Sequence, residues 1–444
     1  MAYSSKNGRR PVEFASKSSH TQVINNAEVQ EFLQHGNVPK KAEDIHIPSG
    51  NLLKFEPADD NPISHIVAID GGFEEIPVQS EFPSSTICFF QFGALIFSIS
   101  DLEKISTQAF IEPEDMAKLK QIERLPFTLP VKNFTYKSEP TLTHSVRRVM
   151  YDFFTKKNDD EKLIDTLKWF IFQEYNKPVT TWNLSSCPHC AASNIPLNRN
   201  SMKPDFTFQC NHCGKEIFLT DVFRFHEAVD DQIGAGSILG YVSTTFEQML
   251  LLHVIRLILK IKPALLQNIL FIKDGPLAFF GQTANMHKPM RSLVKYLFDQ
   301  HNIFLAGLEK SGPFVEHADQ IAEKLETGTI LILDNDYIYK YIIPGKADLN
   351  NPYGGTTYYS NKLIFKSRYY GIHVVSLPTV DVLSSPKPQD LRNLQVILTN
   401  VEKLKCDMYD NALMPVALAN KLVSLAQFPS SKILQRFAVN SVNG

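Results

Sequence analysis

The chain has 444 residues, of which 43% are hydrophobic and 11% aromatic, which excludes a disordered chain and allows about two to three folded domains. Its formal net charge of −2 does not indicate a nucleic-acid binder but does not exclude one, because a near-neutral nuclease can still have a local basic track. The first 45 residues are polar and hold no apolar core of a signal peptide, and the apolar run at 249–259 is too short to span a bilayer. We therefore expect a cytoplasmic protein that does not enter a membrane.

A polar arm with one short helix near residues 26–34 is predicted to open the chain. The stretch SHIVAID at 64–70 then reads as a short apolar strand that ends in Asp70, before Gly71 and Gly72. A carboxylate at the end of a buried strand lies where α/β sheets build their sites. Asp70 is therefore a candidate site residue.

Further strands and helices are expected after this motif. Strand-like runs at 86–92 and 94–99 have a short connection, which predicts an antiparallel meander. Acidic first turns predict helix starts at 101–104 and 112–115, and apolar faces predict helices within 141–176.

The strongest local motif is a pair of CxxC turns. Four cysteines make up these turns: Cys187, Cys190, Cys210 and Cys213. Two such turns complete a tetrahedral zinc site, which predicts a zinc ribbon inserted in a larger fold. Because four-cysteine sites are closed, this zinc is expected to be structural. His189 and His212 remain alternative ligands, and Cys88 and Cys406 are expected to be ordinary buried thiols.

A buried helix is predicted over residues 244–260, and it carries Glu247. Thr244 and Glu247 also fit a capping box, which is a structural alternative for Glu247. The preceding stretch GAGSILG, at 234–240, is interpreted as a flexible connection, because no clear strand precedes it as a dinucleotide loop requires.

The stretch NILFIKDGPL, at 268–277, is a second strand that ends in a carboxylate. Apolar residues lead up to Asp274, and Gly275 and Pro276 then turn the chain. A turn-forming Asp-Gly remains the alternative for Asp274.

Helices and strands alternate through the rest of the chain. We expect helices at 288–299 and 316–325, strands at 304–308 and 329–333, two strands within 358–377, and mostly helices within 390–437.

Asp70, Glu247 and Asp274 form a candidate acidic centre without a paired nucleophile. Such carboxylates suit hard cations such as Mg²⁺ or Mn²⁺. Two of these ions about 4 Å apart activate water and stabilise the leaving oxygen in phosphodiester cleavage. An acid pair for glycoside hydrolysis is an alternative, but it leaves the buried helix and the basic, aromatic segment near Lys366 unexplained.

Four short motifs resemble, in their order, those of the NurA nuclease family, between residues 60 and 430 and outside the ribbon. They are IVAIDGG at 66–72, FIKDGPL at 271–277, LEKSG at 308–312 and Pro415-x-x-Leu418-Ala-Asn420. The resemblance implies an RNase H-like α/β fold, a mixed sheet flanked by helices, here with the inserted four-Cys zinc ribbon. It also implies a Mn²⁺-dependent endo- or exonuclease that acts on DNA ends and single strands, forms a homodimer and associates with a hexameric HerA-type ATPase.

The resemblance also implies roles for individual residues. Asp70, Glu247 and Asp274 match metal ligands, with Glu227 as the fallback for Glu247. Lys310 is expected near the substrate phosphate, and Lys366 and Arg368 are further candidates for substrate binding. Asn420 is a candidate catalytic residue that stands where the family usually has histidine. Asparagine can bind a metal or orient water but cannot act as a general base.

We expect an arm at 1–45, a first nuclease part at 46–150, a helical and ribbon segment at 151–225, and a second nuclease part with C-terminal helices at 226–444. The leading hypothesis is a DNA nuclease that works with a translocating ATPase in DNA-end processing or anti-phage defence. A non-catalytic DNA- or ATPase-binding subunit is the first alternative, and a zinc-ribbon adaptor is the second.

Overall fold

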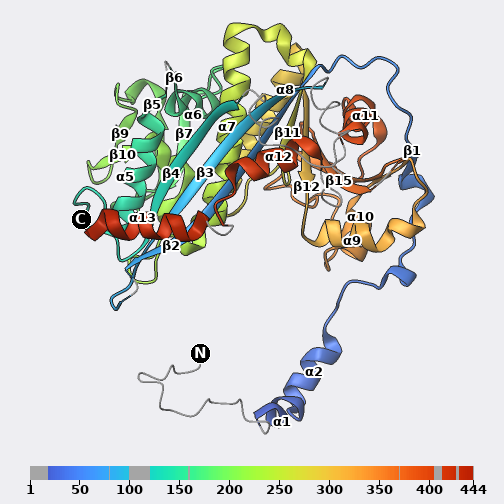
Figure 1. Cartoon of the computed structure of the whole chain (residues 1–444), viewed down its shortest axis with the longest axis horizontal. Coiled ribbons are helices and arrows are strands. Elements are labelled where there is room, and N and C mark those ends of the chain that lie inside the picture. The colour runs from blue at the N-terminus through green and yellow to red at the C-terminus, as the bar shows by residue number, and fades with distance from the viewer. Residues whose placement is uncertain are drawn as a thin grey trace.

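The centre of the protein is a nine-stranded mixed sheet (Figure 1) in the order β1-β13-β14-β15-β12-β11-β2-β3-β4. The computed structural model describes residues 19–79, 81–99, 121–158, 161–369, 371–404, 413–426 and 430–443. The helix starts predicted at 101–104 and 112–115, and Cys406, lie outside these residues. The strands are β1 Leu52–Lys54, β2 His65–Gln79, β3 Ser85–Ser98, β4 Gln121–Lys132, β11 Ile269–Asp274, β12 Phe304–Glu309, β13 Thr329–Ile332, β14 Ser360–Lys366 and β15 Ile372–Pro378.

The strand directions make this sheet RNase H-like. Strands β2, β3 and β4 form an antiparallel meander, whereas β11 is parallel to β2 and β12 is parallel to β11. Four antiparallel strands extend the sheet beyond β12. The predicted α/β fold with a mixed sheet flanked by helices is confirmed.

Strand β2 continues where the sequence predicted its end. It runs through Gly71 and Gly72, which pair with Phe92 and Gln91 of β3, and β3 is itself one strand where two were predicted. The prediction was wrong because the glycines serve a close approach rather than a turn. A Cβ atom on Gly72 would lie 2.5 Å from the carbonyl oxygen of Val423.

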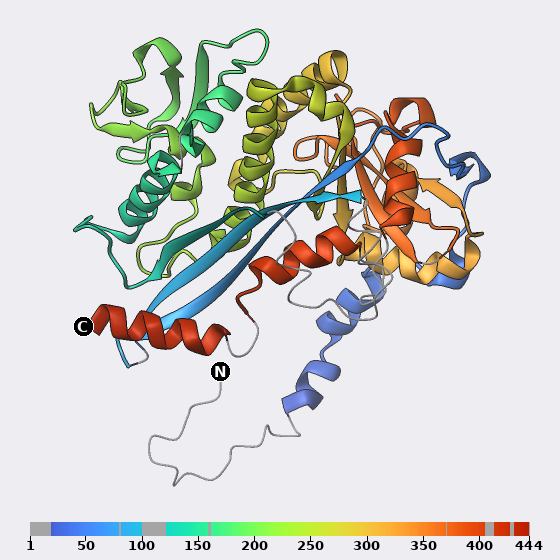
Figure 2. The same ribbon diagram turned by 45° about the horizontal axis from the view of Figure 1, so that its top comes forward.

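Helices cover both faces of the sheet (Figure 2), and each face has its own core. One face packs against α5 Leu142–Thr155, α6 Leu163–Ile171, α7 Leu239–Ile261 and α8 His287–His301. The other packs against α11 Leu394–Lys403 and α12 Met414–Val423. A third core joins α9 Pro313–Ile321 and α10 Asn335–Tyr341 to strands β13 to β15.

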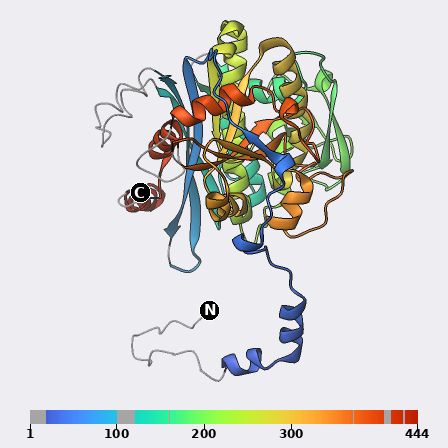
Figure 3. The same cartoon turned by 90° about the vertical axis from the view of Figure 1, so that its right-hand side faces the viewer.

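Helices lie at both ends of the described part of the chain. Helices α1 Ser19–Ile24 and α2 Ala27–His35 extend away from the body (Figure 3), which confirms the helix predicted near residues 26–34. Helix α13 Ser430–Asn443 lies along β2, where Ala438 packs with Ile76 and Val78.

Helix α7 begins five residues earlier than predicted, because a 3-10 turn at Gly236–Ile238 leads directly into it. Thr244 donates its hydroxyl hydrogen to the carbonyl oxygen of Gly240, so it does not cap a helix start. Glu247 therefore lies inside the helix, and the capping-box alternative is wrong. By length and composition the segment Gly236–Ile261 is apolar enough to span a membrane, contrary to our expectation, but 67% of its apolar window is buried inside the protein. It is the core helix that supports β2 and β3.

The ribbon consists of two hairpins between α6 and α7. They pair β7 Thr181–Ser186 with β8 Ser193–Asn198, and β9 Thr207–Gln209 with β10 Glu216–Phe218. Arg147 of α5 anchors the ribbon through a buried bidentate pair with Asp221, with two N···O distances of 2.8 Å.

Candidate active site

Asp70 and Asp274 lie at the same level on neighbouring parallel strands. The register pairs Ile69 of β2 with Lys273 of β11, and the two aspartates follow directly. Asp274 is the last residue of β11, as predicted, and Gly275 turns the chain with φ +84°. Lys310, just beyond the end of β12, joins the two carboxylates, because its Nζ is 2.7 Å from Asp274 Oδ2 and 3.9 Å from Asp70 Oδ2.

Asp70 is a buried acid with an incomplete set of partners. Its residue is 3% exposed, its Oδ1 accepts the N–H of Gly71 at 2.8 Å, and its Oδ2 is buried without a hydrogen-bond partner. Burial, and then the Asp274 and Glu247 carboxylates, raise the pKa of Asp70 to about 8, against the opposing Lys310 ammonium. A bound cation would reverse this shift, because it favours the ionised carboxylate.

Glu247 reaches this cluster from helix α7. A Cβ atom on Gly71 would lie 3.0 Å from Glu247 Oε1, so the carboxylate is next to β2 beside Asp70. Its Oε2 accepts a hydrogen bond of 2.6 Å from Nζ of Lys273. Burial raises the pKa of Glu247, and the Lys273 ammonium opposes that shift. The structure thus brings Asp70, Glu247, Asp274 and Lys310 together, although their metal-binding and catalytic roles remain predictions.

Lys273 is the member of the cluster that we did not predict. It is 1% exposed, and its ammonium also donates to the backbone carbonyl of Asp274. A lysine inside an apolar strand was the available signal, because lysine is almost never fully buried unless it is paired.

Lys366 and Arg368 make contacts of their own at the end of β14. The ammonium of Lys366 donates to the carbonyl oxygens of Ala322 and Leu325, just after α9. Arg368 forms a bidentate pair with Glu402, and its side chain is 39% exposed. No hydrogen bond or ion pair within the described ranges joins either residue to the acids, so their roles in substrate binding remain predictions.

Asn420 and Glu227 are two further predicted residues whose place relative to the acids can be described. Asn420 is exposed on α12, whose last turn is held against β3 by a hydrogen bond of 2.8 Å from Gln91 Nε2 to the Leu422 carbonyl. Glu227 pairs with Arg224 near the ribbon at 2.6 Å. Among the residues that the structure describes, neither has a hydrogen bond or ion pair with the acidic cluster.

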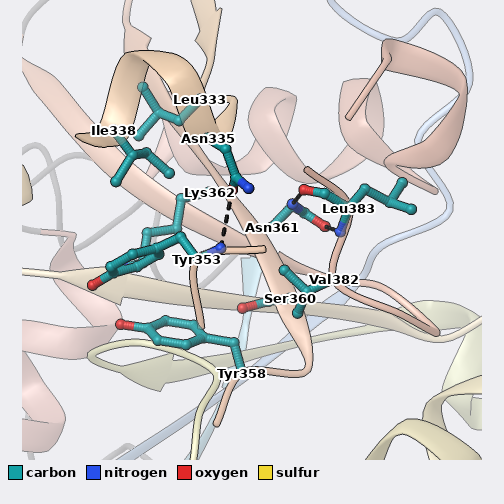
Figure 4. Close-up of a pocket in the computed structure, with 10 residues that line it drawn as sticks. All are labelled: Leu333, Asn335, Ile338, Tyr353, Tyr358, Ser360, Asn361, Lys362, Val382 and Leu383. Atoms are coloured by element: carbon teal, nitrogen blue, oxygen red, sulfur yellow. Dashed lines mark hydrogen bonds between the residues drawn. The ribbon is translucent and has the colours of Figure 1, made fainter. Parts of the chain in front are cut away.

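A second buried ion pair supports the strand end that carries Lys310. Glu309 of β12 accepts a hydrogen bond of 2.5 Å from Lys362 of β14, and the two side chains are 9% and 4% exposed. Figure 4 shows Lys362 beside a cavity of about 10 Å³, which has room for roughly one water molecule. Such a cavity is far too small for a nucleotide, so this pair is a structural support.

The four cysteines form the second candidate metal site. Their sulfur atoms all lie within 4.8 Å of one another, and no other group of three or more such ligands in the described ranges is as compact. The backbone N–H groups of His189 and His212 donate to Cys187 Sγ and Cys210 Sγ, each at 3.4 Å. The ring of His189 contacts the Glu216 carbonyl instead, at 2.8 Å. The four thiolates therefore fit zinc.

Two solved NurA structures are similar to this chain over nearly its whole length. No family model matches the chain, and no curated protein matches it. The NurA nuclease from Sulfolobus solfataricus aligns with 97% of this chain and 98% of its own, at 8% identity and a TM-score of 0.32. A structure of NurA with manganese aligns with 97% of this chain and 99% of its own, at 11% identity and a TM-score of 0.28. These TM-scores are too low to carry an argument about activity, which must come from the residues of this chain.

Proposed function

We propose that this protein is a metal-dependent DNA nuclease whose acidic centre is Asp70, Glu247 and Asp274. One observation carries the proposal, namely that Asp70 Oδ2 is buried beside two further carboxylates and has no hydrogen-bond partner. A second, independent feature is the placement of the cluster at the carboxyl end of β11, where parallel strands of α/β sheets build their sites.

The residues of the cluster fit a hard cation such as Mn²⁺ or Mg²⁺, because they offer carboxylate oxygens. Asp70 and Asp274 would hold the cation, which would supply an activated water and stabilise charge on the leaving oxygen. Lys310 has a 31% exposed side chain, so it can turn from Asp274 toward a substrate phosphate.

The proposal also covers the substrate, the partners and the cellular process of this protein. DNA as the substrate, a homodimer, a HerA-type hexameric ATPase and a part in DNA-end processing or anti-phage defence are supported by the order of the four motifs. A cytoplasmic location is part of the same proposal. The zinc in the ribbon is structural in this proposal.

The second candidate function is a non-catalytic DNA-binding subunit of the same kind of complex. The presence of Asn420 in place of the expected histidine favours it, because asparagine cannot act as a general base.

The decisive assay measures cleavage of linear double-stranded and single-stranded DNA by the zinc-loaded protein with Mn²⁺. We expect cleavage by the wild type and its loss in Asp70→Asn and Asp274→Asn. Asp336→Asn is the matched control, because this aspartate is exposed on α10. Full cleavage by both site variants would disprove the assignment. No cleavage by the wild type, with retained DNA binding, would favour the second candidate.

A further inference from the structure

The two lysines of the acidic cluster differ in how they can respond to a metal. The side chain of Lys273 is 2% exposed and that of Lys310 is 31% exposed. The first is part of the interior, whereas the second is at the surface of the site.

The Lys273 ammonium is surrounded by atoms of the protein. Its ammonium donates to Glu247 Oε2 at 2.6 Å and to the Asp274 carbonyl, and a Cβ atom on Gly275 would lie 3.8 Å from it. Removing this ammonium would leave the Glu247 carboxylate buried without a cation, which is strongly unfavourable. A metal that displaced the Lys273 ammonium would leave it buried without solvent or a partner, so we expect Lys273 to stay in place.

Lys310 is held differently, by ion pairs to Asp274 and Asp70 at 2.7 Å and 3.9 Å. A partly exposed ammonium on a flexible stem leaves for water at little cost, because it is hydrated again there. A divalent cation that displaced Lys310 would be held by Asp70 and Asp274.

The charges in the cluster favour the exchange of Lys310 for one divalent cation but not the binding of a second. When all three carboxyl groups are ionised, as a bound cation favours, they carry one more unit of charge than the two ammoniums balance. Replacing Lys310 by one divalent cation makes the buried cluster neutral, whereas a second divalent cation would leave it with two excess positive charges. Uncompensated charge in a buried site is costly.

We propose that the site takes a single exchangeable divalent cation, bound by Asp70 and Asp274 in the place of Lys310. Lys273 replaces a second metal and acts as a positioning residue that holds Glu247 beside them. This inference rests on the proposed function and narrows the two ions expected from the sequence to one.

The test counts Mn²⁺ bound to the full-length, zinc-loaded protein by electron paramagnetic resonance, which needs no activity. We expect one Mn²⁺ per chain in the wild type and in Glu247→Gln, and none in Asp274→Asn. Lys310→Met should bind one Mn²⁺ more tightly by roughly tenfold, because its competing ammonium is gone. Lys273→Met should bind a second Mn²⁺, because Glu247 is then free to act as a ligand.

Two Mn²⁺ in the wild type, or loss of Mn²⁺ in Glu247→Gln, would overturn the inference, even if Lys273→Met fails to fold. With two Mn²⁺ and DNA cleavage, the proposed function stands and only the single-cation inference fails. If the wild type binds no Mn²⁺ and does not cleave DNA, both fail.

Discussion

The ribbon and the acidic cluster both gather metal-type ligands, but they neutralise the charge of those ligands in different ways. The ribbon holds four sulfur atoms within 4.8 Å and surrounds them with backbone N–H donors. The acidic cluster places the ammoniums of Lys273 and Lys310 among its carboxylates. A closed thiolate set depends on zinc for its fold. The acidic cluster contains its own cations, so it can form without a metal.

Loss of zinc should cause the largest loss of stability, and the unfolding should be confined to the ribbon. Structural zinc contributes apparent binding energies of about 10–16 kcal/mol in small zinc domains, so Cys210→Ser should unfold the two hairpins. Zinc content and trypsin cleavage within residues 187–213 measure this. Cys88→Ser, at a buried thiol in β3, should retain zinc. Equal zinc content in both variants would contradict the assignment.

The second largest loss of stability is expected when the ion pair that anchors the ribbon to α5 is broken. Arg147→Met leaves Asp221 buried without its cation, which should cost about 3–5 kcal/mol in urea unfolding. Arg199→Met is the matched control, because Arg199 is 38% exposed and pairs with Glu174, and such a pair contributes about 0–1 kcal/mol. Similar losses in the two variants would show that the buried pair is not an anchor.

The acidic cluster should make the protein less stable as the pH rises, whereas a carboxylate in a stabilising ion pair makes a protein more stable as the pH rises. The pKa of Asp70 is about 8 in the folded protein against an ordinary value of 3.8, because burial disfavours its charge. The folded state thus binds more protons than the unfolded state between these values, so stability should fall as the pH rises from 4 to 8. The loss is on the order of several kcal/mol without a divalent cation.

Urea unfolding at pH 5 and pH 8 checks this dependence. Asp70→Asn should flatten most of it and be the more stable protein at pH 8, and Mn²⁺ should restore wild-type stability there. An unchanged slope in Asp70→Asn would assign the pH dependence to other groups.

The smallest loss of stability is expected from crowding the contact between Gly72 and Val423, two residues from Asp70. Gly72→Ala places a Cβ atom 2.5 Å from the Val423 carbonyl, and such overpacking should cost about 1–3 kcal/mol. Gly240→Ala is the control, since Gly240 lies in α7 with no atom within 4 Å of the added Cβ. That variant should be neutral or more stable by about 0.5–1 kcal/mol, as measured by thermal unfolding. A lower Tm for Gly240→Ala than for Gly72→Ala would contradict the steric argument.

Local patterns predicted the elements whose signals lie within a few residues. The strand at 269–274, its end at Asp274, the helix at 288–299 and the two CxxC turns are all present in the structure. The end assigned to β2 and the start assigned to α7 were wrong, because pairing with β3 and the preceding 3-10 turn override local signals.

By itself the sequence determined the four clustered cysteines of the ribbon, the alternation of strands and helices, and the three candidate acids Asp70, Glu247 and Asp274. Only the tertiary structure decided that Asp70 lies inside a strand, that Lys273 pairs with Glu247, and that Lys310 joins Asp70 to Asp274. The physical reason is the range of the interactions. A CxxC turn is formed by neighbouring residues, whereas the charge balance of a buried site depends on side chains that parallel pairing and helix packing bring together from distant parts of the chain.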